Sequence, residues 1–221
     1  MVQYFLFFWV LGFMLSCQGP QTERTKIIYN MPAPEPLVQD SDYVQPERDI
    51  WQNPQLIIDR LGDLRGKTVA DLGAGTGYFS FKLIENAEKV IAIDIDERFI
   101  NFINNKLRNL PKDIQLRFEA RLGEANNPHL GKEEVDAILV VNTYIYIRNR
   151  ISYFTKLKQS IKPNGKIAVV DFKELQMPVG PAKQIKVPGY IVVEELKKAG
   201  YKNIVLDNSS LDYQYIIIAE K

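Results

Sequence analysis

Residues 69–78 read VADLGAGTGY, and this stretch decides the fold. A short apolar run, residues 69–72, is followed by glycine at every second position from 73 to 77, and then by Tyr78. Glycine has no Cβ, so the chain can turn tightly there and a ligand can approach the backbone closely. The stretch therefore predicts a buried strand, a ligand-binding turn and a helix, in that order.

Strand-like and helix-like segments alternate along the chain on both sides of this turn. Asn53 is expected to cap a helix that starts at Pro54. Residues 162–165, which read KPNG, are expected to form a turn. Apolar runs or alternating apolar residues predict seven strands, at residues 69–72, 90–93, 114–118, 135–141, 167–170, 203–206 and 213–219. Near-continuous apolar strands with helices between them indicate a mostly parallel sheet that is covered on both faces.

The last two predicted strands differ from the others because only a short polar link, residues 207–210, lies between them. Parallel neighbours need a crossover of about a dozen residues or more. The two strands must therefore form an antiparallel hairpin at the end of the sheet. This ending distinguishes the chain from a dinucleotide-binding Rossmann domain.

The glycine spacing carries a resemblance to a known family. A dinucleotide fingerprint reads G-x-G-x-x-G, whereas this turn reads G-x-G-x-G and has an acid, Asp71, two residues before the first glycine. The pattern resembles the first S-adenosylmethionine (SAM) motif of class I methyltransferases. Over about 170 residues from Arg48 onward, the resemblance implies an α/β, Rossmann-like fold, SAM as the cofactor and methyl transfer as the reaction. It implies a methionine-binding set of Asp71, Gly73, Ala74, Gly75, Gly77 and Tyr78.

Further cofactor contacts are expected after the next strands. Asp94 follows the first glycine by about 20 residues, the usual offset of an acid that binds a ribose, and Ile95 is placed beside it in the same site. Asp96 is assigned as the cap of the next helix. Residues 123–125, Gly-Glu-Ala, are similar to a Gly-Asp-Ala segment of the family, so that Glu124 and Ala125 would contact the adenine, with Asn126 as the alternative acceptor. Asn142 would line the methyl donor.

The acceptor side is expected after the fourth and fifth strands, where Tyr144, Asp171 and Lys173 stand. We predict that these three residues contact the acceptor, and that the rings of Trp51, Tyr144 and Tyr146 wall the site. The alternatives are that the tyrosines are ordinary packing aromatics and that Lys173 is a solvated surface lysine. Four short stretches are also similar to a narrower group of bacterial methyltransferase-like proteins; they are residues 48–54, 170–173, 178–181 and 213–215.

The N-terminus indicates a separate segment. Residues 4–15 are an apolar run with the length of a signal-peptide core, and they end next to Leu15-Ser16-Cys17-Gln18-Gly19, which resembles a bacterial lipoprotein signal. We expect residues 1–17 to be a signal peptide that leads to a lipidated Cys17, residues 18–47 to be a flexible tether, and residues 48–221 to be the methyltransferase domain. The resulting location is the bacterial cell envelope, on a membrane. Residues 1–3 carry no Lys or Arg, so an uncleaved anchor, or a misassigned start with a cytoplasmic protein, stays as the alternative.

Composition narrows the classes of function. The chain has 221 residues and a net charge of +1, with one cysteine and one histidine. The balanced charge disfavours a nucleic acid as the partner, and the single Cys and His form no zinc-type cluster. We predict a SAM-dependent methyltransferase that acts on a small molecule, a lipid or an envelope component. The alternatives are a non-catalytic protein with the same fold and, less favoured by the glycine spacing, a nicotinamide-dependent enzyme.

Overall fold

The computed structural model describes residues 47–176 and 178–221. The expected signal peptide and almost all of the expected tether lie outside these residues. In the described part, no helix is both long enough and apolar enough to cross a membrane.

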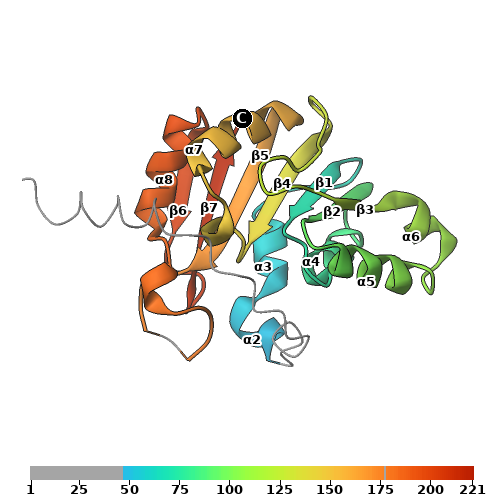
Figure 1. The fold of residues 1–221 in the computed structure, drawn as a ribbon, viewed down its shortest axis with the longest axis horizontal. Coiled ribbons are helices and arrows are strands. Elements are labelled where there is room, and N and C mark those ends of the chain that lie inside the picture. The colour runs from blue at the N-terminus through green and yellow to red at the C-terminus, as the bar shows by residue number, and fades with distance from the viewer. Residues whose placement is uncertain (1–46, 177) are drawn as a thin grey trace, which may run out of the picture. The chain divides into compact units, whose positions relative to one another are not determined.

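A seven-stranded sheet forms the centre of the domain (Figure 1). Its order is β3-β2-β1-β4-β5-β7-β6. Only β7 runs against its neighbours β5 and β6. The strands are β1 Thr68–Leu72, β2 Lys89–Asp94, β3 Phe118–Leu122, β4 Val135–Val141, β5 Ile161–Phe172, β6 Lys202–Asp207 and β7 Gln214–Glu220. The predicted fold class, a mostly parallel sheet that ends in an antiparallel hairpin, is confirmed.

Two groups of helices cover the two faces of the sheet. Helices α3, α4 and α5 pack on one face, where their apolar side chains join those of the central strands in a single core. On the other side, α7 packs against α8, and α8 packs against β6 and β7. The α-helices are α2 Arg48–Gln52, α3 Pro54–Asp59, α4 Tyr78–Leu83, α5 Glu97–Leu107, α6 Lys112–Arg117, α7 Arg150–Leu157 and α8 Gly189–Lys198, and the short 3-10 helices are η2 Tyr144–Tyr146, η3 Lys158–Ser160 and η4 Lys183–Ile185.

The two predicted helix caps are present. The Asn53 side chain accepts the N–H of Leu56 at the start of α3, with Pro54 as the first helical residue. The Asp96 side chain accepts the N–H of Arg98 at the start of α5. Each carboxylate or amide oxygen satisfies a donor that the first turn of a helix leaves without an intrahelical partner.

The strand predicted at residues 114–118 is wrong in its first part. Residues 112–117 form the helix α6, and β3 begins only at Phe118. Ile114 and Phe118 alternate with Leu116 as in a strand, but a spacing of four residues also fits one face of a helix. Pro111 supplies a rigid start, and the exposed Leu116 points away from the core. The alternation was therefore compatible with both structures.

The turn predicted at residues 162–165 lies inside β5 as an irregular bulge. Pairing with β4 shifts between Ile161 and Lys166, and Asn164 has a left-handed φ of 62°. The Lys162 ammonium pairs with Asp136 across this bulge at 2.8 Å. The bulge leaves the core half of β5 in register with β4 up to Val170, so the carboxyl ends of the two strands remain neighbours.

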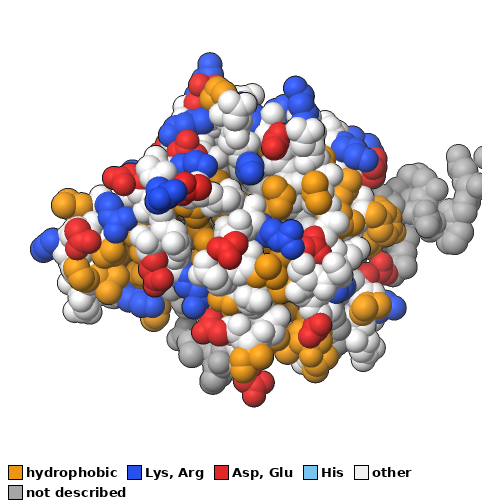
Figure 2. Space-filling view, turned by 180° about the vertical axis from the view of Figure 1, so that it is seen from behind, with side chains coloured by type: hydrophobic (Ala, Val, Ile, Leu, Met, Phe, Trp, Pro, Cys, Tyr) orange, Lys and Arg blue, Asp and Glu red, His pale blue; other side chains and the backbone are white. Residues whose placement is uncertain are grey.

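Charged side chains are spread over the face of the molecule in Figure 2, where acidic and basic groups lie between hydrophobic ones. No single sign of charge dominates that face. This distribution agrees with the net charge of +1.

Candidate functional site

The site lies where the order of the strands reverses. The chain passes from β1 outward to β2 and β3, and then returns to β4 on the other side of β1. Ligands of open α/β sheets bind at the carboxyl ends of the strands at this reversal. The glycine turn follows β1 and Asn142 follows β4, so the two meet at the reversal point. In Figure 1, α2 lies at the end of the sheet toward which β4 points.

The glycine turn has the backbone that its sequence predicts. Gly73, Gly75 and Gly77 have φ values of 77°, 54° and 81°, in a region that side chains with a Cβ rarely adopt. The N–H of Gly73 donates to the carbonyl of Ile93 in β2 at 2.8 Å, which fixes the turn against the sheet. A Cβ on Gly73 would lie 2.2 Å from Oγ1 of Thr143. The turn therefore abuts the segment that follows β4.

Asp71 is buried beneath this turn. It is 2% exposed, and its Oδ2 accepts the Ser80 hydroxyl at 2.6 Å. Burial raises the pKa of its carboxyl group to about 6, although the Ser80 hydrogen bond acts in the opposite direction. Asp71 thus ties β1 to the first turn of α4 and holds the glycine turn from below.

Asp94 stands at the end of β2 with both oxygens engaged. Its Oδ2 accepts the N–H of Gly75 at 2.8 Å, and its Oδ1 accepts the N–H of Asp96 at 3.0 Å. Burial raises the pKa of this carboxyl group, against the effect of these N–H donors. A carboxylate has about four lone-pair sites, so two backbone donors leave acceptor capacity for a ligand. Ile95, next along the chain, is 60% exposed.

Glu124 and Ala125 lie in an exposed turn after β3. The N–H of Gly123 donates to the Asp94 carbonyl at 2.8 Å, which joins this turn to the end of β2. The Glu124 carboxylate is 64% exposed and lies 3.3 Å from Nε2 of His129. The turn therefore offers an accessible acid close to Asp94, where the sequence predicts the adenine.

Tyr78 opens α4 and is covered by the short helix α2. Its hydroxyl donates to the Asp49 carboxylate, and the Arg48 guanidinium lies over its ring, 4.1 Å from the centroid. Lys82 also pairs with Asp49 at 3.1 Å. These contacts place α2 over the N-terminus of α4, beside the glycine turn. Burial, followed by the hydrogen bond to Asp49, raises the pKa of the Tyr78 hydroxyl, although the Arg48 guanidinium acts in the opposite direction.

The three residues predicted to contact the acceptor occupy different environments. Tyr144 is fully buried, and its hydroxyl donates to Glu195, whose carboxylate also accepts Arg150 Nε at 2.7 Å. Burial is the main cause that raises the pKa of Tyr144 well above its usual value, and the neighbouring Glu195 charge raises it further. Lys173 Nζ donates to the carbonyls of Leu211 and Asp212, at 2.7 and 3.1 Å. The Tyr144 and Lys173 side chains are therefore both hydrogen-bonded to other parts of the protein, Tyr144 to α8 and Lys173 to the segment before β7.

Asp171 is different because one of its oxygens lacks a partner. Its Oδ1 accepts the N–H of Phe172 at 2.8 Å, while its Oδ2 is buried and makes no hydrogen bond among the described residues. Burial raises the pKa of the carboxyl group to about 7, although the backbone N–H groups of Tyr144 and Ile145 and the Lys186 ammonium act in the opposite direction. A buried carboxyl group with spare capacity and such a pKa can hold a proton near neutral pH.

The predicted aromatic wall is present only in part. The Trp51 ring lies 5.9 Å from that of Phe172 and 6.3 Å from that of Tyr213, so α2, β5 and the start of β7 meet there. Tyr144 faces α7 instead, where its ring stacks on Phe154. Phe172 and Tyr213 were not among the expected site residues, but both belong to stretches that the sequence had marked.

Three polar residues of the site were not predicted from the sequence. They are Arg48, Gln52 and Gln214. The Gln52 and Gln214 side chains are fully buried and hydrogen-bonded to each other at 2.8 Å. Their only sequence signal was membership of the marked stretches 48–54 and 213–215. Nothing in a single sequence pairs residues that are so far apart along the chain.

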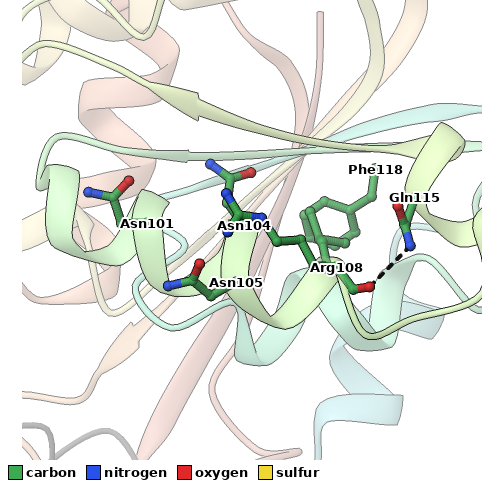
Figure 3. Close-up of a pocket in the computed structure, with 7 residues that line it drawn as sticks. Asn101, Asn104, Asn105, Arg108, Gln115 and Phe118 are labelled. Atoms are coloured by element: carbon green, nitrogen blue, oxygen red, sulfur yellow. Dashed lines mark hydrogen bonds between the residues drawn. The ribbon is translucent and has the colours of Figure 1, made fainter.

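A pocket of about 380 Å³ lies elsewhere (Figure 3). It is bordered by polar residues of α5 and by Gln115, whose side-chain amide donates to the Arg108 carbonyl at 3.5 Å. Phe118, at its base, begins β3. The pocket therefore lies toward the amino end of the sheet and shares no residue with the glycine turn.

The comparisons with known proteins agree with this geometry. Residues 63–211 match the family model described as a methyltransferase domain. The chain belongs to this family. Its fold is that of the class I, SAM-dependent methyltransferases, as the sequence predicted, and with the family comes SAM as the cofactor.

Individual relatives are distant. A demethylmenaquinone methyltransferase of Lactococcus lactis is 28% identical over 139 residues, which cover 60% of this chain and 52% of that protein. An uncharacterized methyltransferase of Schizosaccharomyces pombe is 27% identical over 48% of this chain and 39% of its own. The chain thus spans about half or less of the length of these relatives.

Among solved structures, a SAM-dependent methyltransferase of Aquifex aeolicus has a TM-score of 0.73 and 24% identity, and the match covers 82% of this chain and 95% of that one. A phosphoethanolamine N-methyltransferase of Haemonchus contortus, solved with S-adenosyl-L-methionine, has a TM-score of 0.65 and 13% identity, over 77% of this chain and 52% of that one. At these identities the likeness concerns the fold.

Proposed function

We propose that this protein transfers a methyl group from SAM to an acceptor held beside the carboxyl ends of β4 and β5. The observation that carries the proposal is the Asp94 carboxylate, fixed by the N–H groups of Gly75 and Asp96 at the strand reversal. An acid at this place suits the two hydroxyls of a ribose, which need a double acceptor.

The chemistry of the surrounding groups fits SAM. The cofactor carries a sulfonium and an ammonium group, and the site supplies the acids Asp71, Asp94 and Glu124. SAM also carries a carboxylate. That group suits the Arg48 guanidinium over Tyr78 and the N-terminus of α4 beside the glycine turn. A pyrophosphate would meet the buried Asp71 instead, which disfavours a dinucleotide. In our proposal the glycine turn and Tyr78 hold the methionine part, Asp94 and Ile95 the ribose, Glu124 and Ala125 the adenine, and Asn142 the methyl region.

SAM brings an activated methyl group, so the protein's main task is to align the acceptor and to exclude water. We assign Asp171 as the group that takes a proton from an acceptor that must lose one, because its buried Oδ2 makes no hydrogen bond within the described residues and burial raises its pKa to about 7. Tyr144 and Lys173 act as positioning residues. Tyr144 anchors η2 to Glu195, and Lys173 anchors the segment before β7.

The acceptor class that we propose is broad: a small molecule, a lipid or an envelope component. The relative from Lactococcus is named for demethylmenaquinone, and a Haemonchus enzyme was solved with phosphomonomethylethanolamine. We further propose that lipidation of Cys17 holds the domain at a membrane. That part of the proposal rests on the apolar run and the residues around Cys17.

Transfer of label tests the proposal. The full chain is incubated with SAM that carries a tritiated methyl group and with a bacterial envelope extract, and the extract is then assayed for label. We expect label in the extract with the natural chain and much less with Asp94→Ala when the SAM concentration is near the Kd of the natural chain. A protein that binds SAM but transfers no label to lipid, small-molecule or envelope fractions would contradict methyl transfer to these classes.

A further inference from the structure

Four side chains form a continuous hydrogen-bonded relay across the site. Nε of Arg48 donates to Oε1 of Gln52 at 2.6 Å, and Nε2 of Gln52 donates to Oε1 of Gln214 at 2.8 Å. Nε2 of Gln214 then donates to Oδ1 of Asn142 at 2.5 Å. The relay joins α2, the first residue of β7 and the residue after β4. Gln52 and Gln214 are fully buried, so water cannot replace these bonds.

The first residue of the relay sets the direction of every bond in it. A guanidinium group only donates, so the Gln52 atom that faces Arg48 must be the carbonyl oxygen. The amide nitrogen of Gln52 therefore faces Gln214, and the same logic passes through Gln214 to Asn142. Each amide has one donor end and one acceptor end, and reversing any one of them would set two donors or two acceptors against each other.

At the Asn142 end of the relay, this order of donors and acceptors leaves the side-chain nitrogen of Asn142 as a donor. Its Oδ1 is used by Gln214, whereas its Nδ2 makes no hydrogen bond among the described residues. The Asn142 backbone is fixed, because its N–H donates to the Val170 carbonyl at 2.9 Å and its φ is 55°. The next residue, Thr143, approaches the Gly73 carbonyl to 3.5 Å. Asn142 thus stands between the glycine turn and β5.

We propose that Gln52 and Gln214 are positioning residues that aim the Nδ2 donor of Asn142 at the methyl acceptor, and that the acceptor is therefore an oxygen, which accepts this hydrogen bond with one lone pair and keeps another lone pair for the bond to the methyl carbon. This inference rests on the proposed function and narrows its substrate class. A protonated amine has only donors to offer, so it would meet the amide donor of Asn142 without a hydrogen bond. Carboxylates, phenolates and enolates accept such a bond.

The relay also gives a reason for the position of α2. Arg48 begins the relay and at the same time lies over Tyr78, at the start of α4. The orientation of the acceptor-side amide therefore depends on a residue that stands on the cofactor side. Gln52 and Gln214 act through Asn142, because their side-chain hydrogen bonds in the described part of the chain reach neither the glycine turn nor the Asp171 side chain.

Two substitutions of Gln214 separate orientation from folding. Gln214→Met keeps much of the side-chain volume and removes both amide bonds, so that Asn142 loses its orientation. Gln214→Glu replaces the donor toward Asn142 with an acceptor, which favours the flipped Asn142 amide with Oδ1 toward the site. Gln55→Glu is the matched control. It makes the same chemical change on an exposed residue of α3 that bonds Asp59 and not the relay.

The test uses the full chain saturated with S-adenosylhomocysteine, and two probes of similar size, benzoate and benzylammonium. Side-chain amide resonances are followed by ¹⁵N–¹H NMR at pH 8, and the Asn142 pair is identified by its loss in Asn142→Asp. We expect benzoate, and not benzylammonium, to shift the Asn142 pair in the natural chain and in Gln55→Glu. Gln214→Met should weaken benzoate binding about tenfold, the scale of one hydrogen bond, and Gln214→Glu should abolish the preference for benzoate.

Two results in the natural chain would overturn the inference: a shift of the Asn142 pair by benzylammonium, with or without a shift by benzoate, or no shift with either probe in protein that has bound S-adenosylhomocysteine. An unchanged probe preference in Gln214→Glu that remains folded would also overturn it. Failure of the natural chain to bind S-adenosylhomocysteine is a different outcome, because it would overturn the proposed function itself.

Discussion

Removal of the Asp94 carboxylate probes the cofactor site at its best-defined point. In the structure this group accepts two backbone N–H groups, from Gly75 and Asp96, and keeps acceptor capacity for a ligand. Asp94→Ala removes both kinds of contact. Hydrogen bonds to a charged group contribute about 1.5–3 kcal/mol each. We therefore expect the binding free energy of SAM to weaken by about 2 kcal/mol, which is about a 30-fold rise in Kd.

Asp96→Ala is the control for this experiment. Asp96 lies two residues away, and its side chain caps α5 through the N–H of Arg98. Loss of an N-cap costs about 1 kcal/mol of stability, so the control should lower the thermal midpoint but leave the Kd of SAM unchanged. Isothermal titration calorimetry gives the Kd of both variants, and circular dichroism verifies that both are folded.

The outcome that refutes the reasoning is specific. If Asp94→Ala is folded and binds SAM as tightly as the natural chain, the Asp94 carboxylate does not contact the ribose. If Asp94→Ala and Asp96→Ala weaken SAM binding equally, the effect comes from disturbance of the start of α5 and not from a direct contact.

Three further predictions concern stability, pH and location. Glu195→Gln removes the buried carboxylate charge that pairs with the Arg150 guanidinium, so denaturant unfolding should show a loss of about 3 kcal/mol. Lys197→Ala removes an exposed ion pair and should cost much less. Equal losses in the two variants would contradict the importance of burial. Because the pKa of Asp171 is raised from 3.8 to about 7, the folded state binds its proton more tightly, and the free energy of unfolding should fall as the pH rises from about 4 to about 7. Urea titrations at several pH values should give a flatter profile for Asp171→Asn, and an unchanged slope would contradict the raised pKa. Cys17→Ser should prevent lipidation and move the protein out of the membrane fraction on immunoblots, and an unchanged distribution would contradict the lipoprotein hypothesis.

The order of elements could be predicted from the sequence because each signal was local. The glycine turn at 73–77 joins a strand to a helix, and the caps Asn53 and Asp96 act within a few residues of themselves. The final hairpin followed from the shortness of the link between its strands. The error at residues 114–118 arose because the apolar pattern there is also a purely local signal. Ile114 and Phe118 suit either a strand or a helix face, and only the position of Leu116 away from the core decides between them.

The candidate site was predictable at its cofactor end and less so at its acceptor end. Asp71 and Asp94 stand at strand ends, which a topology rule places together. The bond between Gln52 and Gln214 joins residues 162 positions apart, and no spacing rule connects them. Tyr144 was marked correctly as part of the segment after β4, but its burial against Glu195 depends on the packing of α8, which a single sequence does not specify. The cofactor and acceptor assignments of individual residues stay predictions.

The central claim, a SAM site at the reversal of the sheet, is tested most directly by calorimetric titration of the full chain with SAM, S-adenosylhomocysteine and NAD. The structure predicts saturable, one-to-one binding of the first two compounds and none of NAD, because Asp71 lies beneath the glycine turn where a pyrophosphate would have to bind. Binding of NAD by the folded protein, or failure to bind both methyl-cycle compounds, would contradict the claim.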